Sequence, residues 1–147
     1  MERKKLIYIQ YAVIFVLIIV FGITNFLIKT SDVWRSKIPR YEYRTISPKD
    51  LMGMMDRNNE LIIIDTRLAE DFKSGHIKGA INLPSTNLKM TEKALRKERE
   101  KEIVIYSEDG ERSKATSDIL SNLGFSKIRN LDGGIKGWIN SGGAAIK

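Results

Sequence analysis

The chain has 147 residues, which is room for one ordinary domain and a short appendage. It contains no cysteine, so disulfides, cysteine-ligated zinc and thiol nucleophiles are excluded. The net charge of +7 does not indicate nucleic-acid binding, because residues 1–44 hold eight Lys/Arg against three Asp/Glu, whereas residues 45–147 are nearly balanced at seventeen against fifteen.

The first predicted element is the apolar run Leu6–Ile28, 23 residues without a charged side chain. As a helix it is long enough to cross a hydrocarbon core of about 30 Å. The run is longer than the apolar part of a signal peptide, and no small-x-small cleavage site follows it, although a cleaved signal peptide is the alternative. We therefore predict an N-terminal tail and transmembrane helix at 1–28, a basic juxtamembrane linker at 29–43 and a domain at 44–147.

We expect this single-pass segment to lie in a bacterial inner (cell) membrane. Two features of the sequence favour opposite orientations. Five basic residues follow the run, which favours a cytoplasmic domain by the positive-inside rule. The short N-terminal tail carries three clustered cations, which favour the opposite orientation. The count slightly favours the cytoplasm for the domain. The residues compared are Arg3, Lys4 and Lys5 before the run, and Lys29, Arg35, Lys37, Arg40 and Arg44 after it.

The domain then begins with an extended piece at Tyr43–Ile46. Ser47 and Pro48 mark the start of a helix, with Ser47 as N-cap, and this helix ends near Asn58. The apolar run Leu61–Asp65 is typical of a strand buried on both faces. The next predicted elements are a short helix at Leu68–Lys73, a strand at Ala80–Pro84 and a charged surface helix at Thr91–Glu100.

A second buried strand is predicted at Ile103–Tyr106. An amphipathic helix follows at Ser113–Leu123, with Ala115, Ile119, Leu120 and Leu123 as its apolar positions. A last strand at Lys127–Leu131 leads to a short helix that carries Trp138, which we interpret as a core residue. Strands that alternate with helices predict an α/β fold with a parallel sheet of about five strands, flanked by helices on both faces.

Ligands of such sheets bind at the carboxyl ends of the strands, where two polar segments stand out. Asp65 and Arg67 follow one strand, and we expect them to organise this edge by hydrogen bonds and an ion pair. Ser107–Arg112 follows another strand and precedes a helix. A tight loop at a helix N-terminus directs backbone N–H groups inward and favours an anion.

Three blocks of the sequence closely resemble the signatures of the rhodanese family. Together they cover about residues 44–140 in the family's order, and they imply its fold. The blocks are Ile63–Arg67 with Glu70–Phe72 and Gly75–Pro84, then Ile103–Ser113, then Leu123–Phe125 with Leu131–Trp138.

The family's active loop reads Cys-x-x-Gly-x-Arg-Ser, and its cysteine carries a sulfane sulfur as a persulfide. The resemblance places Ser107 at that cysteine, Gly110 at the loop glycine, Arg112 at the anion-facing arginine and Ser113 at the following serine. The six positions from Ser107 to Arg112 resemble the sulfurtransferase branch, since related dual-specificity phosphatases have one more. The lone histidine, His76, falls in a structural signature, where its implied role is to shape a turn.

Ser107 is incompatible with persulfide chemistry, which needs a polarizable thiolate, and no general base is evident beside it. Three acidic residues in the loop, Glu108, Asp109 and Glu111, also oppose an anion unless they face solvent; with them in place, a cation or a basic peptide becomes a possible ligand.

We therefore expect a catalytically inactive, membrane-anchored module for binding or scaffolding, without cofactor, metal or nucleic acid. Its partner is either a membrane protein or a small ligand held in the loop that begins at Ser107. One alternative is a sulfurtransferase whose natural cysteine was exchanged for Ser107; a more remote one is hydrolysis by Ser107 itself.

Overall fold

The computed structural model describes residues 2–35, 40–58 and 60–147. The chain divides into two compact units, Met1–Ile38 and Pro39–Lys147, which are described separately. In chain order the elements are α1 (Glu2–Arg35), β1 (Arg44–Ile46), α2 (Pro48–Arg57), β2 (Ile62–Asp65), α3 (Ala69–Ser74), β3 (His76–Ile77), β4 (Ala80–Asn82), the 3-10 turn η1 (Ser85–Asn87), α4 (Leu88–Leu95), β5 (Ile103–Tyr106), α5 (Glu111–Asn122), β6 (Ile128–Leu131), α6 (Gly134–Asn140) and β7 (Ala145–Ile146).

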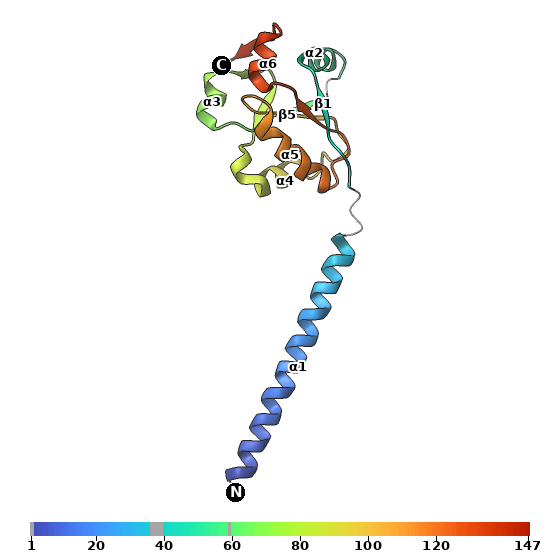
Figure 1. Ribbon diagram of the computed structural model, residues 1–147, viewed down its shortest axis with the longest axis vertical. Helices are drawn as coiled ribbons and strands as arrows, with labels where there is room; N and C mark the ends of the chain where they lie inside the picture. The colour runs from blue at the N-terminus through green and yellow to red at the C-terminus, as the bar shows by residue number, and fades with distance from the viewer. Residues whose placement is uncertain (1, 36–39, 59) are drawn as a thin grey trace. The chain divides into compact units, whose positions relative to one another are not determined.

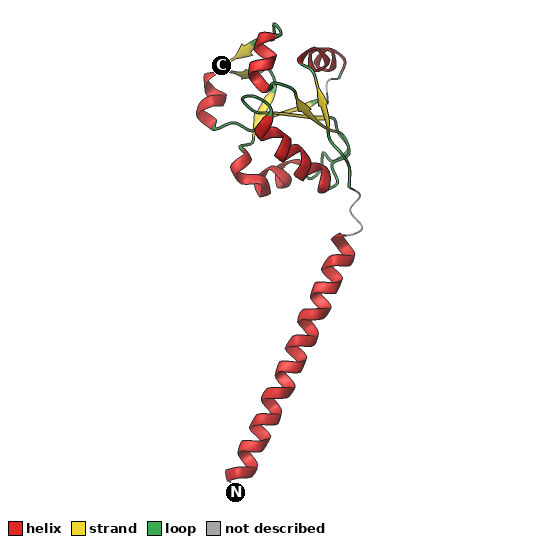
Figure 2. Cartoon of the chain, in the orientation of Figure 1, coloured by secondary structure: helices red, strands yellow, loops and turns green. Residues whose placement is uncertain are grey.

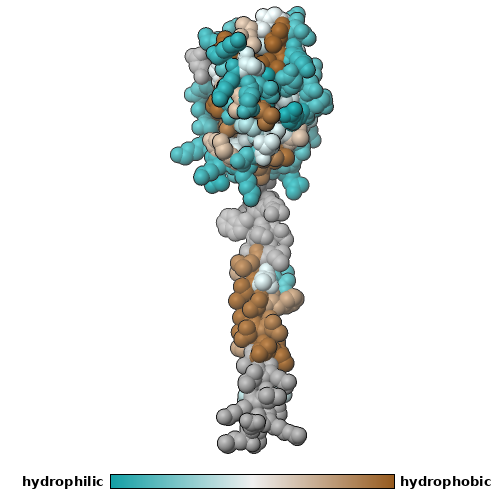
Figure 3. Space-filling model, turned by 90° about the vertical axis from the view of Figure 1, so that its left-hand side faces the viewer, coloured by the Kyte–Doolittle hydropathy of each residue, from teal (hydrophilic) through white to brown (hydrophobic). Residues whose placement is uncertain are grey.

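The first unit consists of the helix α1, along which apolar side chains gather in Figure 3. The run Leu6–Ile28 falls within it. Across the described residues, no helix combines the length and the apolarity needed to cross a membrane. The first part of the segment predicted as a linker, 29–43, is helical, because α1 continues to Arg35. Extending a formed helix costs far less than starting one, so polar residues can follow the apolar run without a break.

The second unit is built on a five-stranded sheet in the order β1-β6-β5-β2-β4, with all neighbouring pairs parallel (Figure 2). The predicted α/β fold with a parallel sheet is confirmed. The central strands β5 and β2 are the two apolar runs that the sequence marks as buried on both faces. The strand predicted at Ala80–Pro84 ends earlier, at Asn82.

Successive residues of each central strand point to opposite faces of the sheet, which creates two cores. Ile63 and Val104 belong to the core under α2 and α6, which includes Leu51 and Trp138. Ile64, Ile103 and Ile105 belong to the core under α4 and α5, which includes Leu95 and Leu120. In Figure 1, α4 and α5 accordingly lie together on one side of the sheet and α2 and α6 on the other. Trp138 is a core residue, as predicted.

The helix α2 begins where the sequence places it. Ser47 is the N-cap, and its hydroxyl accepts a hydrogen bond from the Asp50 amide at 3.2 Å. The Asp50 carboxylate in turn accepts from the Ser47 amide at 3.0 Å, which completes a capping box. Hydrogen bonds with Ser47 hold the pKa of Asp50 below its usual value.

Two helices differ from their predicted form. The helix predicted at Thr91–Glu100 begins earlier, because the Asn87 side chain caps α4 through the amide of Met90 at 3.1 Å. In α5, the predicted apolar positions Ala115 and Ile119 are exposed, and the buried residues are mostly Ser and Thr. Small side chains allow the helix to pack close to the sheet, and among the described residues the hydroxyls of Ser117 and Ser121 are buried without a hydrogen-bond partner.

A small second sheet was not predicted. In it, β3 pairs antiparallel with β7, with His76 opposite Ile146 and Ile77 opposite Ala145. Each strand has two residues, too few for a periodic pattern. The pairing attaches the end of the chain to the segment that follows α3.

Candidate functional site

The two polar segments singled out by the sequence lie side by side at the carboxyl ends of β2 and β5. Asp65 pairs with Tyr106 in the parallel register, so the loops that follow both strands start at the same level. The Thr66 amide and hydroxyl both donate to the Tyr106 carbonyl at 2.9 Å. Thr66 thereby ties the loop after β2 to the last residue before Ser107.

The Ser107 hydroxyl is fully buried inside the turn formed by Ser107–Gly110 and the first turn of α5. Its Oγ accepts hydrogen bonds from the Gly110 amide at 3.1 Å and from the Ser113 amide at 3.4 Å. The Ser113 Oγ lies 3.3 Å away and donates to the Gly110 carbonyl at 3.0 Å. Since Ser113 has a single hydroxyl proton, its oxygen remains available to accept the proton of Ser107.

The backbone of this turn rests on the start of α6. The Ile135 and Lys136 amides donate to the carbonyls of Ser107 and Glu108 at 2.9 and 3.2 Å. Gly134, with φ of +57°, leaves no space for a side chain, because a Cβ there would lie 2.7 Å from the Gly110 nitrogen and would overlap the Ser107 carbonyl oxygen. Contact this close between two backbone segments requires glycine.

A chain of charged side chains runs along one side of the turn. Arg67, only 4% exposed, forms an ion pair with Asp65 at 2.7 Å and donates to the Gly75 carbonyl at 2.7 Å. Arg67 also reaches Glu108 at 3.4 Å, and Lys136 contacts the other carboxylate oxygen of Glu108 at 3.4 Å. The ion pair expected between Asp65 and Arg67 is present, and it extends to the turn through Glu108.

The acidic residues of the loop are held outside the turn. Glu108 is occupied by Arg67 and Lys136, and the exposed Glu111 forms an ion pair with Lys114 at 2.5 Å. Asp109 is exposed and accepts from the Glu111 amide at 3.1 Å. Their negative charge is therefore partly compensated locally, and the Ser107 oxygen meets hydrogen-bond donors rather than carboxylates.

Arg112 lies in the first turn of α5 and is exposed. Within the described residues it has no ion pair and no side-chain hydrogen bond. Its guanidinium is thus available to an incoming anion.

Tyr106 and His76 support the site from the side of β3. The Tyr106 hydroxyl accepts a hydrogen bond from the Ile77 amide at 3.2 Å, and burial raises the pKa of this phenol well above its usual value. His76 stacks on Phe72 with ring centroids 3.8 Å apart, and its Nδ1 lies 3.0 Å from the Phe72 carbonyl. His76 makes these contacts in the segment between α3 and β4 rather than in the Ser107 turn.

Sequence reasoning did not identify Tyr106, Gly134 and Lys136 as parts of this site. In the sequence, Tyr106 cannot be distinguished from the other buried residues of its strand, and Lys136 cannot be distinguished from the many surface lysines. Gly134 carries a signal, since it is the second of two consecutive glycines before a helix, but the turn it contacts lies more than twenty residues earlier in the chain.

Chemically, the turn offers hydrogen-bond donors to a hydroxyl or an anion at position 107. Arg67 engages both Asp65 and Glu108, and His76, the one histidine among the described residues, makes its contacts with Phe72. Nucleophilic serine catalysis needs an adjacent base. Among the described residues, no group of three His, Cys, Asp or Glu side chains could hold a metal ion.

The family model of the rhodanese-like domain matches residues 47–141, which includes the whole site. The chain is 36% identical over 76 residues to the uncharacterized protein YqhL of Bacillus subtilis, and 30% identical over 94 residues to MoeZ of Mycobacterium tuberculosis, a probable adenylyltransferase/sulfurtransferase. These matches cover 52% and 64% of the chain. The matched parts make up 59% of YqhL and 24% of MoeZ, so the chain corresponds to only part of each relative.

Solved structures show the same fold. A rhodanese-related protein from Thermoplasma volcanium superimposes with a TM-score of 0.63 at 31% identity, over 71% of this chain and 98% of that one. The thiosulfate sulfurtransferase from Pseudomonas aeruginosa superimposes with a TM-score of 0.64 at 28% identity, over 71% of this chain and 20% of the enzyme.

Proposed function

Because the chain belongs to the rhodanese-like domain family, we propose that it is a module of this fold without sulfurtransferase activity, which acts by binding a partner at a membrane. In this proposal Ser107 occupies the position of the catalytic cysteine. One observation carries it: the group inside the turn is a fully buried hydroxyl, bonded to two amides and a second hydroxyl. Sulfur transfer through a persulfide requires a thiolate there, and the chain contains no cysteine.

The preserved turn supports a second candidate function. The amides of Gly110 and Ser113 donate to the one side-chain atom that would become sulfur in a cysteine. Donors of this kind at a helix N-terminus lower the pKa of a thiol. If the natural protein carries cysteine at position 107, the same geometry supports a sulfurtransferase.

A thiosulfate:cyanide sulfurtransferase assay on the full chain beside Ser107→Cys tests both candidates. We expect no turnover with serine and measurable turnover with cysteine. Ser74→Cys, on an exposed residue at the end of α3, is the matched control for a thiol outside the turn. Turnover by the serine form would refute the proposal. Absence of turnover in a correctly folded Ser107→Cys variant would exclude the second candidate function.

Anchoring at the membrane is the other part of the proposal, and its support is the sequence. Leu6–Ile28 carries no charged side chain, and basic residues flank it on both sides. We propose that this run contacts the lipid bilayer and that the domain, slightly favoured on the cytoplasmic side, meets a membrane-protein partner there. The full chain should remain with membranes after alkaline carbonate extraction, and a version without residues 1–28 should be released.

The absence of native cysteine makes the orientation directly measurable. A single cysteine introduced at the exposed Ser141 can be labelled with a maleimide reagent that does not cross membranes. Labelling only after cell lysis supports a cytoplasmic domain. Labelling of intact spheroplasts would place the domain outside.

A further inference from the structure

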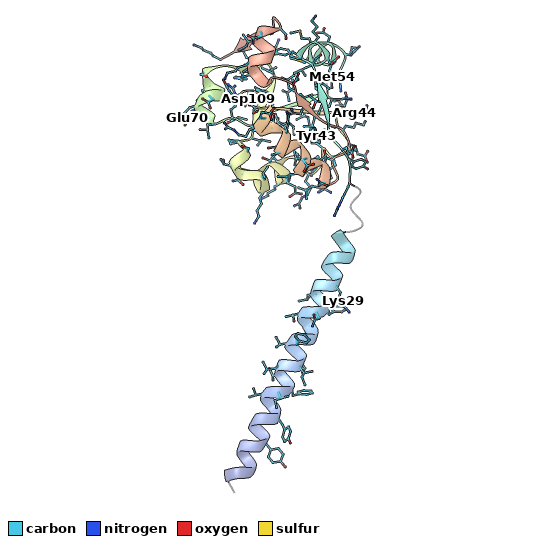
Figure 4. All side chains as sticks on the ribbon, in the orientation of Figure 1. Lys29, Tyr43, Arg44, Met54, Glu70 and Asp109 are labelled. Carbon is cyan, nitrogen blue, oxygen red and sulfur yellow. The ribbon has the colours of Figure 1, made fainter. Side chains whose placement is uncertain are left out.

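A pocket of about 630 Å³ lies at the end of the sheet opposite Ser107. It is formed where β1, β5 and β6 begin, whereas Ser107 follows the last residue of β5. Its volume lies within the range of small-ligand sites. Figure 4 labels two of its residues, Tyr43 and Arg44, and labels Asp109 in the turn after β5. The pocket shares no residue with the turn.

The lining of this pocket is rich in basic side chains. Four Lys/Arg and two Glu line it, together with two tyrosines. The basic residues are Arg40, Arg44, Lys127 and Arg129. The excess is local, because the second unit as a whole is close to neutral.

Two of these arginines face each other across a strand pair. Arg44 on β1 is the register partner of Arg129 on β6. Register partners on neighbouring strands lie about 5 Å apart and share one face of the sheet. Like charges directly opposite each other are destabilising, so an anion bound between them would add to the compensation that Glu102 gives Arg129.

Of the two acidic residues, Glu102 pairs directly with only one of the four basic residues, Arg129. Glu102 is engaged by Arg129 at 2.6 Å and by the Asn58 amide at 3.2 Å, and its hydrogen bond with Arg129 lowers its pKa. Within the described part of the chain, Arg40, Arg44 and Lys127 form no ion pair. Arg129 keeps a buried Nε–H without a hydrogen-bond partner there. A buried donor of this kind is costly unless a ligand or water satisfies it.

From this geometry we propose that the pocket binds a phosphate group through Arg44, Lys127 and Arg129. Arginine binds phosphate through paired N–H groups and lysine through its charge, and a tetrahedral dianion can bridge all three. Arg40 follows the apolar run Leu6–Ile28 by 12 residues in the sequence. If the proposed anchoring holds, phospholipid headgroups are one source of the phosphate. Free phosphate compounds are the other.

Calorimetric titration of the full chain in neutral detergent with inorganic phosphate and with glycerol 3-phosphate tests the site itself. We expect saturable binding of both, weakened about tenfold or more in Arg44→Gln and in Lys127→Gln. Lys89→Gln, on an exposed residue of α4 that does not line the pocket, should bind like the parent. Both substituted residues in the pocket are exposed, so a thermal melt can verify that the variants fold. Absence of binding by the parent, or equal weakening in Lys89→Gln, would overturn the proposal.

The source of the phosphate is tested in nanodiscs of phosphatidylcholine with and without phosphatidic acid. Slower amide exchange of residues 40–46 with phosphatidic acid, lost in Arg44→Gln, identifies the headgroup. Phosphate binding in detergent without this slowing assigns the site to soluble phosphate compounds. The detergent titration does not require anchoring, so failure of the anchoring proposal and failure of the pocket proposal remain distinguishable.

Discussion

Replacement of Gly134 by alanine should destabilise the second unit much more than the same replacement at Gly142. Both glycines have positive φ, +57° and +91°. A Cβ at position 134 would overlap the Ser107 carbonyl oxygen and lie 2.8 Å from the Glu108 carbonyl carbon. A Cβ at position 142 would meet nothing within 4 Å. Gly142→Ala therefore isolates the cost of the backbone conformation.

The expected magnitudes follow from these contacts. The left-handed conformation costs a residue with a Cβ about 1–2 kcal/mol, and this applies to both variants. Overlap in a packed interior adds about 1–3 kcal/mol, since the atoms that must move at Gly134 belong to backbone and not to a flexible side chain. The total for Gly134→Ala is about 2–5 kcal/mol. At roughly 4 °C per kcal/mol, its Tm should fall by about 8–20 °C, against about 4–8 °C for Gly142→Ala.

Urea denaturation followed by circular dichroism, with a thermal melt of the same samples, measures both losses. An unchanged slope against urea would show that the difference lies in stability and not in the extent of unfolding. Equal losses in the two variants would refute the reasoning, because they would mean that the turn moves away from α6 at no cost. In Ser107→Cys, the added Gly134→Ala should also abolish any turnover, since the turn could no longer keep its donors in place.

Two further predictions concern the charged and phenolic groups of the site. Asp65→Asn should lower the free energy of unfolding in urea by about 3–5 kcal/mol, because it leaves the buried Arg67 without its main partner. Glu108→Gln should lower it by less than about 1 kcal/mol, because this carboxylate is 42% exposed. Equal losses in the two variants would contradict this ranking. The raised pKa of Tyr106 means that only the unfolded chain loses this proton above about pH 10, so stability should fall there by up to about 1.4 kcal/mol per pH unit. Tyr106→Phe should be less stable at neutral pH and show a shallower alkaline decline; parallel pH profiles would argue against this assignment.

The sheet and most of its elements could be predicted because local patterns and tertiary packing agree. The apolar β-branched runs that form β2 and β5 indicate burial on both faces, and both lie at the centre of the sheet. The capping box at Ser47 needs only residues three positions apart, so the start of α2 is visible in the sequence.

The features that escaped prediction depend on tertiary contacts. The buried face of α5 contains Ser117 and Ser121, which hydropathy assigns to the surface. The two-residue strands β3 and β7 exist only because the fold brings them together. In the site, the sequence indicates that the loop after β5 lies at the carboxyl end of the sheet. The contact of this loop with α6 through Glu108 and Lys136 could not be predicted, because the two residues are far apart in the chain and no local pattern connects them.

The buried position of β5 has a consequence for how the site can open. β5 is flanked on both sides by other strands and covered on both faces, and Ser107 follows it directly. The amides of such a strand exchange with solvent only when the whole domain unfolds, whereas loops and edges exchange through local openings. The Ser107 turn is bonded to this strand and to α6, so we expect it to belong to the slowest-exchanging group of amides. The amides of Gly110 and Ser113, which are bonded inside the turn, should then have the same hydrogen-exchange protection factors as those of Val104 and Ile105. The turn would open only when the whole domain unfolds.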